Sequence, residues 1–327
     1  MPLSASILAA SIISEGCDRN EGWQRSSGAV WNTLYNVTWH GPAALADSIL
    51  PALRPVDESL SVFNDSSIVS RVNSNLITEV DDHFKLIYTL SYHINSLSRG
   101  AFDPTLEPAI EAWGFGRSRT PSADTLRCDS LRRFVGITRT RLVGDSLIKH
   151  DIRTRFNFSA IAKGYGCDLV AAMLKRNGVT DFLVEIGGEV VCRGSNHRAT
   201  KWQIAIDAPE ENREGLPRND RRAETVSLTD MALATSGNYR NFHTSAGGGN
   251  FGHTISAQTC RPARTDVISA TVAAKTCMEA DALATTLMAI GSGRAKALCE
   301  KTKTPAMLIL ADSSRVYLQD FQSLITR

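Results

Sequence analysis

The segment Asn157-Phe-Ser-Ala-Ile-Ala-Lys-Gly-Tyr-Gly-Cys-Asp168, together with the two apolar runs that follow it, decides the fold class. Ser159 can cap a helix that begins within this segment. The first apolar run, Phe182–Ile186, ends in Gly187-Gly188, and Glu189–Arg193 returns from that turn as the second. A helix followed by two consecutive strands joined at a glycine turn predicts α and β structure without a βαβ crossover at this point.

Helical and strand-like patterns alternate irregularly along the rest of the chain. Asp82–Leu97 carries its apolar residues on one stripe, which predicts an amphipathic helix that Gly100 can end. Trp31–Trp39 alternates with a period of two, as a half-buried strand does. We expect further helices at Ala44–Leu53, Asp65–Asn73 and Met278–Ile290, the second of them capped by Asp65 or Ser66. Further strands are expected at Trp202–Asp207, Thr225–Leu228, Ala232–Thr235, Asn238–His243, Val267–Ala274, Ala306–Leu310 and Val316–Leu318. Because there is no regular βαβ rhythm and no internal repeat, these elements predict the α+β class and one compact unit, in one or two lobes.

Composition describes an ordinary folded protein and excludes several functional classes. Of the 327 residues, 43% are hydrophobic and 21% are charged, which is typical of a globular chain. The net charge of +2 and the lack of a dense Lys/Arg run argue against nucleic acid as a partner. The seven cysteines lie far apart without a Cys-x-x-Cys pair, so we expect buried thiols and no zinc site.

The N-terminus has the features of a targeting segment. Leu3–Ile13 is mostly apolar, is too short to span a bilayer, and ends near Cys17. It is similar to a secretion signal running into a lipid-modified cysteine, although no Lys or Arg precedes it and the residues before Cys17 depart from the preferred pattern. A plain leader and a frayed end are the alternatives. We expect residues 1–30 to be a leader and tether, and residues 31–327 to be the folded domain. Through a lipidated Cys17 that domain would be held at a bacterial inner membrane, facing the periplasm.

Common nucleotide-binding loops are absent, and a lysine offers the first candidate site. Neither G-x-x-x-x-G-K-[ST] nor G-x-G-x-x-G occurs. Lys163 stands in the first turn of the helix expected after Ser159, where the helix dipole disfavours a cation. A ligand-facing lysine there calls for an anion, and phosphate is the natural one. The alternative is a surface lysine on an amphipathic helix.

A carboxylate and a hydroxyl form the second candidate. Asp281 and Thr285 are four residues apart, so on a helix they share one face, which is otherwise built from Ala and Leu. Mg²⁺ takes such oxygen ligands and leaves room for phosphate oxygens. The alternative is a capping Asp beside a Thr bonded back to its own helix.

The third candidate lies between residues 234 and 256. Ser236 and Gly237 are typical of a tight turn between strands, and His253 would lie on the returning strand. A lone histidine is more often structural than catalytic, and the sequence leaves both readings open.

In this order, the segments resemble the ApbE-type family of FAD:protein FMN transferases. The resemblance runs from about Trp31 to Leu310, nearly the whole chain after the leader. The matching segments are Leu60–Asn73, Phe102–Thr105, Trp113–Phe115, Ala160–Asp168, Glu185–Gly188, Ala234–Tyr239 and Ala280–Thr285. Since so many separate motifs match, the family assignment is specific, and it implies an ApbE-like fold related to the T-fold.

The resemblance also implies a reaction and a set of site residues. FAD would be the substrate and Mg²⁺ the metal, with FMN transferred through a phosphoester bond to a Thr or Ser hydroxyl of an acceptor flavoprotein, such as a subunit of a membrane redox complex, and AMP released. A homodimer remains open, and the alternatives are an FAD pyrophosphatase and a non-catalytic FAD-binding protein. By this resemblance the catalytic residues are Asp281, His253 and Lys163; the metal ligands are Ala160, Asp281, Ala284 and Thr285; and the FAD pocket holds Trp31, Phe63, Asn64, Asp103, Pro104, Thr105, Lys163, His253 and Thr254.

Three positions depart from the family pattern. Asn157 stands where the family usually has Asp. Ala257 and Cys260 occupy the Pro and Gly positions of a turn after His253. Because Gly permits a positive φ there, we expect Cys260 to alter or loosen that turn.

Overall fold

The computed structural model describes residues 22–117, 120, 125–208, 222–237, 242–244 and 250–326. Its centre is a sheet of eight strands in the order β1-β2-β5-β6-β9-β14-β15-β16, with every neighbouring pair antiparallel. This sheet belongs to a single α+β domain, as the sequence predicts. The strands are β1 (Trp23–Val30), β2 (Thr33–His40), β5 (Phe182–Ile186), β6 (Glu189–Arg193), β9 (Met231–Gly237), β14 (Val267–Ala274), β15 (Ala306–Leu310) and β16 (Arg315–Leu318).

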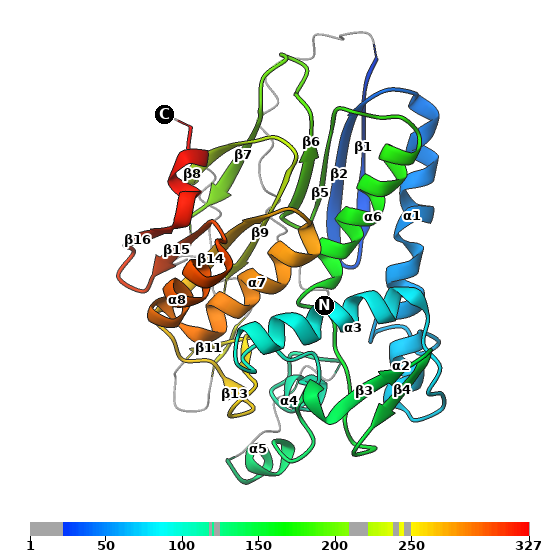
Figure 1. The fold of residues 1–327 in the computed structure, drawn as a ribbon, viewed down its shortest axis with the longest axis vertical. Coiled ribbons are helices and arrows are strands. Elements are labelled where there is room, and N and C mark those ends of the chain that lie inside the picture. The colour runs from blue at the N-terminus through cyan, green and yellow to red at the C-terminus, as the bar shows by residue number, and fades with distance from the viewer. Residues whose placement is uncertain are drawn as a thin grey trace.

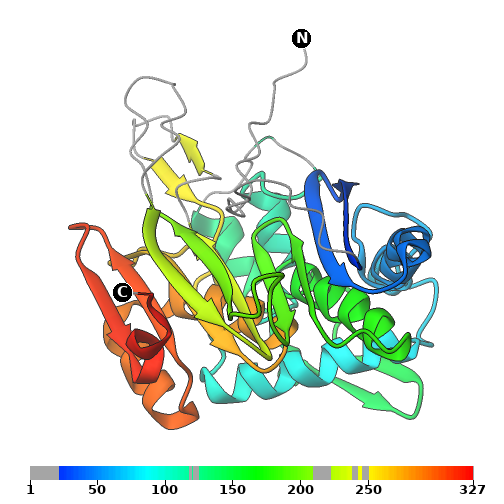
Figure 2. The same cartoon turned by 90° about the horizontal axis from the view of Figure 1, so that it is seen from above.

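Helices cover one face of this sheet, as Figure 1 shows with α3, α6 and α7 in front of the strands. Seen from above in Figure 2, the same helices lie together on one side. The α-helices are α1 (Ile49–Pro55), α2 (Ile68–Asn73), α3 (Asp82–Leu97), α4 (Glu107–Ala112), α5 (Thr125–Leu131), α6 (Ala162–Arg176), α7 (Cys277–Ile290) and α8 (Ser292–Thr302). Short 3₁₀ or π turns are η1 (Ala43–Ser48), η2 (Val56–Leu60), η3 (Ile137–Arg139) and η4 (Gln319–Leu324). No helix within the described ranges is long and apolar enough to cross a membrane.

A hairpin covers the other face of the sheet, so the central strands are buried on both sides. It consists of β7 (Trp202–Asp207) and β8 (Arg222–Leu228). In β5, Val184 packs toward the helices and Leu183 toward the hairpin. Burial on both faces explains why β5 is a continuous apolar run rather than an alternating one.

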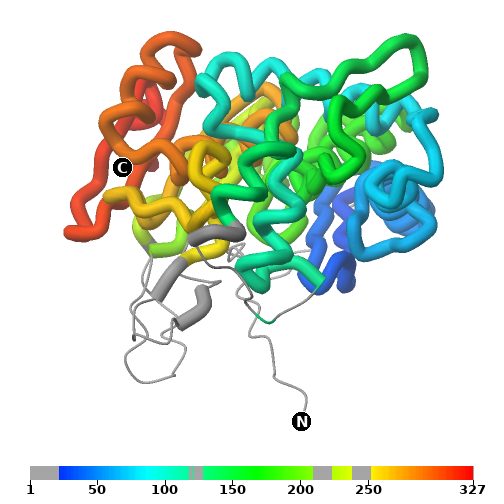
Figure 3. The backbone as a smooth tube through the Cα atoms, turned by 90° about the horizontal axis from the view of Figure 1, so that it is seen from below, coloured from blue at the N-terminus to red at the C-terminus, as the bar shows by residue number. Residues whose placement is uncertain are grey.

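Three two-stranded pairs complete the fold. They are β3 (Thr140–Val143) with β4 (Ser146–Lys149), β10 (Phe242–Thr244) with β11 (Asn250–Gly252), and β12 (Ile255–Ser256) with β13 (Arg261–Pro262). The β12–β13 pair and helices α4 and α5 share a small apolar cluster. Figure 3 shows the yellow 250–262 segment beside the teal-green 105–135 segment.

The sheet begins earlier than the sequence predicts. Instead of one strand over Trp31–Trp39, β1 and β2 form a hairpin, with Trp31 and Asn32 at its tip in the left-handed region (φ of 49° and 59°). Residues 23–30, assigned to the leader, are therefore a strand of the main sheet. Cys17 and the apolar run before it lie outside the described residues.

Two predicted helix caps are also wrong. The first turn of α2 is capped by Ser67, whose side chain accepts a hydrogen bond from Ser70 N at 3.1 Å, and not by Asp65 or Ser66. Helix α6 begins at Ala162 without a side-chain cap, and not at Ser159. By contrast, the bounds of α3 are as predicted, and Asp81 caps it. The six cysteines within the described ranges are free and buried, as expected.

Candidate active site

The first turn of α6 makes an unusual hydrogen bond. Gly164 N–H donates to Asp281 Oδ2 of α7 at 3.0 Å, and not to the carbonyl of Ala160 four residues earlier. In a regular helix that carbonyl would be its acceptor. Within the described part of the chain, no backbone N–H donates to Ala160 O. The Ala160 carbonyl is therefore left without its usual helical partner, while the N–H that would have bonded to it binds Asp281.

A close helix contact makes this bond possible. A Cβ on Gly164 would lie 2.3 Å from Cys277 O and 2.8 Å from Met278 N, so only glycine fits between the two backbones. Asp168, one turn further along α6, accepts hydrogen bonds from Cys277 N and Met278 N, both at 2.9 Å. The first turn of α7 is thus held against α6 by a glycine contact and a carboxylate.

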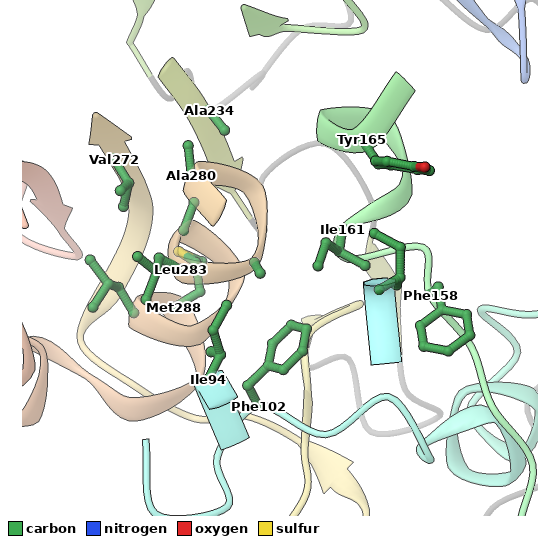
Figure 4. Close-up of a cluster of buried hydrophobic side chains, with 14 of the residues drawn as sticks. Ile94, Phe102, Phe158, Ile161, Tyr165, Ala234, Val272, Ala280, Leu283 and Met288 are labelled. Atoms are coloured by element: carbon green, nitrogen blue, oxygen red, sulfur yellow. The ribbon is translucent and has the colours of Figure 1, made fainter. Parts of the chain in front are cut away.

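An apolar cluster packs against α6 and α7. Ala280, Leu283 and Met288 of α7 belong to the same core cluster as Phe158 and Ile161, which precede α6. Figure 4 shows these side chains together with residues of α3 and the sheet. A close-packed layer of this kind leaves little freedom to the polar groups above it.

Asp281 and Thr285 share one face of α7, as predicted. The Asp281 side chain is 3% exposed, and Thr285 Oγ1 lies 3.0 Å from Ser236 Oγ of β9. Burial, with the nearby Glu189 carboxylate, raises the pKa of Asp281 well above its usual range, against the opposing pull of Lys163. The alternative of a back-bonded threonine applies to Thr286, which donates to Ala282 O at 2.7 Å. Asp281 caps no helix of its own.

Lys163 already has an anionic partner. Its Nζ lies 2.5 Å from Glu189 Oε1, and the lysine side chain is 36% exposed while that of Glu189 is 2% exposed. Burial lowers the pKa of Lys163, but the carboxylates of Glu189 and Asp281 outweigh it, so the ammonium stays protonated. The sequence left open whether Lys163 faces a phosphate or lies on the surface, and the structure places the Glu189 carboxylate against its ammonium.

The donor set fits Mg²⁺. The Lys163 ammonium faces two carboxylates, those of Glu189 and Asp281. Such a buried excess of negative charge is costly without a further cation. The Ala160 carbonyl, Asp281 and Thr285 supply only oxygen, which is what Mg²⁺ binds. Ala284 is a poorer candidate, because it lies inside α7, where carbonyls accept intrahelical bonds.

The predicted flavin-pocket residues near the N-terminus lie on ordered turns. Trp31 Nε1 donates to Asp57 Oδ1 at 2.9 Å. Asn64 Nδ2 donates to Asp57 O at 3.0 Å, and the ring of Phe63 beside it is 64% exposed. A large aromatic ring held outward by its neighbours can stack on a flavin or an adenine.

Asp103 and Thr105 bind each other and groups of neighbouring segments. Asp103 Oδ1 accepts from Thr105 N at 2.9 Å and from its hydroxyl at 2.6 Å, while Oδ2 accepts from Ile137 N at 3.0 Å. Pro104 O accepts from Asn157 N at 2.7 Å. Any contact of residues 103–105 with FAD would therefore be made by a turn that these bonds hold rigid.

His253 lies just after β11, and not on a returning strand as predicted. Its ring meets that of Phe115 edge-on, with centroids 6.3 Å apart. Thr254 is buried next to it. Ser236 and Gly237 are the last residues of β9, and Asn238 and Tyr239 of that motif fall outside the described residues.

Comparisons with known proteins establish the family of the chain. The ApbE family model matches residues 31–309, most of the chain. The chain belongs to the ApbE family. A Vibrio cholerae protein named FAD:protein FMN transferase is 32% identical over 316 residues, covering 93% of this chain and 92% of that protein. A Haemophilus influenzae protein of the same name is 30% identical over 302 residues, covering 87% of this chain and 85% of that protein.

Solved structures of ApbE proteins share the fold. The flavin transferase ApbE from Vibrio cholerae has a TM-score of 0.81 at 30% identity, covering 92% of this chain and 99% of its own. The apo form of the flavinyl transferase ApbE from Pseudomonas stutzeri has a TM-score of 0.82 at 29% identity, covering 92% and 96%. The family and the fold inferred from the sequence are thus confirmed.

One departure from the ApbE pattern has a physical explanation. Asn157 Nδ2 donates to Glu107 Oε2 at 2.6 Å, and Asn157 Oδ1 accepts from Ser159 N at 2.8 Å. Glu107 is 1% exposed, and burial raises the pKa of its carboxyl to about 7. An Asp at position 157 would place a second carboxylate against it. Asn157 instead supplies a donor, and it holds the turn that carries Ala160.

We expect Asn157→Asp to destabilise the protein in a pH-dependent way. The Glu107 pKa rises from 4.5 to about 7 on folding, so ionising Glu107 costs stability as the pH rises through that interval. A second buried carboxylate should enlarge that cost to about 3 kcal/mol at pH 8. At pH 5.5 the two groups can share a proton, and the loss should shrink. Urea unfolding at both pH values measures it.

The matched control exchanges the amide and the carboxylate between positions 157 and 107. In Asn157→Asp/Glu107→Gln, the new amide can donate to the new carboxylate, so most of the stability lost at pH 8 should return. An equal loss at pH 5.5 and pH 8, or no recovery in the double variant, would contradict this account of Asn157.

The other departure leaves the turn intact. Cys260 adopts a φ of 54°, the conformation that glycine usually takes. Its N–H donates to Ser256 O at 2.8 Å, and its carbonyl accepts from Trp113 Nε1 at 2.8 Å. The expectation of a loosened turn is therefore wrong for the backbone. The left-handed conformation costs about 1 kcal/mol, which burial of the thiol offsets.

Sequence reasoning missed two carboxylates of this region. Glu189 opens the strand Glu189–Arg193, ahead of the apolar residues Val190 to Cys192, and a charged residue at that position was the available signal. Glu107 gave no signal, because its partner Asn157 is 50 residues away. Only the tertiary structure brings that pair together.

Proposed function

We propose that the protein is a Mg²⁺-dependent FAD:protein FMN transferase that attaches FMN to a Thr or Ser hydroxyl of an acceptor flavoprotein and releases AMP. The observation that carries this proposal is the diverted Gly164 N–H, which binds Asp281 and leaves the Ala160 carbonyl without its helical partner. An oxygen-only site of this kind suits a metal that also binds phosphate oxygens. Relatives named FAD:protein FMN transferase support the choice of substrate.

Each side chain has a role in this reaction. The acceptor hydroxyl oxygen bonds to the FMN-side phosphorus while the bond from that phosphorus to the AMP phosphate breaks, and AMP leaves with its electron pair. His253 takes the hydroxyl proton, as an imidazole commonly does near neutral pH. Asp281, Thr285 and the Ala160 carbonyl would hold Mg²⁺, which would neutralise charge on the pyrophosphate. Lys163 adds a second positive charge, and the exposed ring of Phe63 supports the flavin or the adenine.

A transfer assay tests the proposal. The protein is incubated with FAD and Mg²⁺, with and without a flavoprotein subunit that carries an Asp-Gly-x-Ser/Thr-x-Ala-Thr motif. Flavin fluorescence on denaturing gels reports covalent FMN, and AMP release is followed in parallel. We expect labelled subunit and stoichiometric AMP. AMP with free FMN and no label would identify a pyrophosphatase, and bound but intact FAD would identify a binding protein.

We also propose that the protein works at the bacterial cell envelope, facing the periplasm, with Cys17 as a lipid anchor to the inner membrane. The apolar run before Cys17 supports this placement. Cys17→Ser should move the protein from the membrane fraction to the soluble fraction after cell lysis. Retention of the variant in the membrane fraction would rule out Cys17 as the anchor.

A further inference from the structure

Glu189 has a buried oxygen without a hydrogen-bond partner. Oε1 binds Lys163 Nζ at 2.5 Å, but no described group donates to Oε2. Buried carboxylate oxygens are nearly always paired, so an orphan calls for an explanation. The neighbouring Glu185 differs, because its two oxygens accept from Asn36 Nδ2 at 2.7 Å and from Gly188 N at 2.8 Å.

Glu189 faces both charged groups of the proposed site. Its carboxylate holds the Lys163 ammonium, and its charge acts on Asp281. The lysine side chain is 36% exposed and that of Glu189 only 2%, so Lys163 is the more accessible partner of this pair. A charge at this position favours a cation near Asp281 and opposes an anion near Lys163.

We propose that Glu189 is a positioning residue that holds Lys163 back from the FAD pyrophosphate and strengthens the cation site of Asp281. The inference rests on the proposed function. It predicts that removing this one charge changes the two affinities in opposite directions: FAD binds more tightly and the metal more weakly. If Glu189 had a merely structural role, its substitution would weaken the binding of both FAD and metal or change neither affinity.

The test measures the two ligands separately in Glu189→Gln. Glutamine keeps the shape and an acceptor for Lys163 Nζ. FAD affinity is measured without metal by quenching of flavin fluorescence, and metal affinity without FAD by electron paramagnetic resonance of Mn²⁺, used as the probe for Mg²⁺. We expect the FAD Kd to fall about fivefold, the scale of a partly exposed charge pair. The Mn²⁺ Kd should rise about tenfold, since this charge is buried.

A double-variant cycle tests the route through Lys163. In a Lys163→Met background, Glu189→Gln should no longer tighten FAD, yet it should still weaken Mn²⁺. Glu185→Gln is the matched control and should change neither Kd by more than about twofold, because Glu185 does not bind the ammonium. Thermal unfolding of each variant confirms that it is folded.

The outcomes separate this inference from the function. The role of Glu189 would be overturned if the affinities for FAD and Mn²⁺ moved in the same direction in Glu189→Gln. It would also be overturned if Glu189→Gln still tightened FAD binding in the Lys163→Met background, or if Glu185→Gln changed both affinities in the same way as Glu189→Gln. A wild-type protein that binds FAD and Mn²⁺ but labels no acceptor would instead overturn the transferase proposal and leave the charge test readable.

Discussion

Asp281→Asn should lower Mg²⁺-dependent AMP release from FAD by roughly a thousandfold, which corresponds to the loss of several kcal/mol of metal-borne charge stabilisation. Asparagine can still accept the hydrogen bond from Gly164 N, so the geometry between α6 and α7 should survive. What the variant loses is the carboxylate charge. AMP release is measured at saturating FAD over a series of Mg²⁺ concentrations.

The stability of this variant should change in the other direction. The Asp281 side chain is 3% exposed and repelled by Glu189, so its charge costs stability when no cation is bound. In EDTA, Asp281→Asn should therefore unfold at or above the wild-type temperature, and added Mg²⁺ should no longer raise it. Asp281→Ala should lose the same activity but also stability, because Gly164 N then loses its acceptor.

Two results would contradict the assignment of Asp281. Unchanged Mg²⁺-dependent AMP release in Asp281→Asn would remove this residue from the metal site. A variant that is inactive but still stabilised by Mg²⁺ as the wild type is would place the cation elsewhere.

Gly164→Ala should lower the free energy of unfolding by about 3 kcal/mol. The added methyl group would lie 2.3 Å from Cys277 O and 2.6 Å from Cys277 C, which are backbone atoms at the start of α7. That turn cannot retreat easily, since Asp168 binds its first two N–H groups. Urea unfolding measures the loss, and Mn²⁺ affinity should fall with it because Gly164 N positions Asp281.

Gly293→Ala is the matched control. Gly293 lies in α8, and nothing stands within 4 Å of the place where its Cβ would be. Alanine is the better helix former, so this variant should gain about 0.5–1 kcal/mol. If Gly164→Ala gained stability as well, the close contact between α6 and α7 could not be as described.

Long periodic elements could be predicted from sequence alone, but several element ends could not. The stripe of apolar residues determines α3, and burial on both faces makes β5 recognisable. The cap of α6 was mistaken, because its first N–H groups are arranged by α7 and not by a local side chain. The strand β1 was missed, since an edge strand without buried residues carries little periodic signal.

Part of the candidate site could likewise be predicted from the sequence. The spacing of Asp281 and Thr285 placed both on one helix face, and the ordered motifs identified the ApbE family, which the comparisons confirm. These are local or cumulative properties of the chain, and sequence determines them because helix geometry relates residues four apart.

Only the tertiary structure decided how the charges are shared. Lys163 meets Glu189, the Ala160 carbonyl loses its helix partner, and Asn157 meets Glu107. Each of these contacts depends on residues from different elements. Their energies are therefore set by helix packing and burial and not by sequence spacing. The sequence indicates Lys163, Asp281 and Thr285 as candidate site residues. The burial that shifts the pKa values of Lys163 and Asp281 arises only when α6, α7 and the sheet pack together.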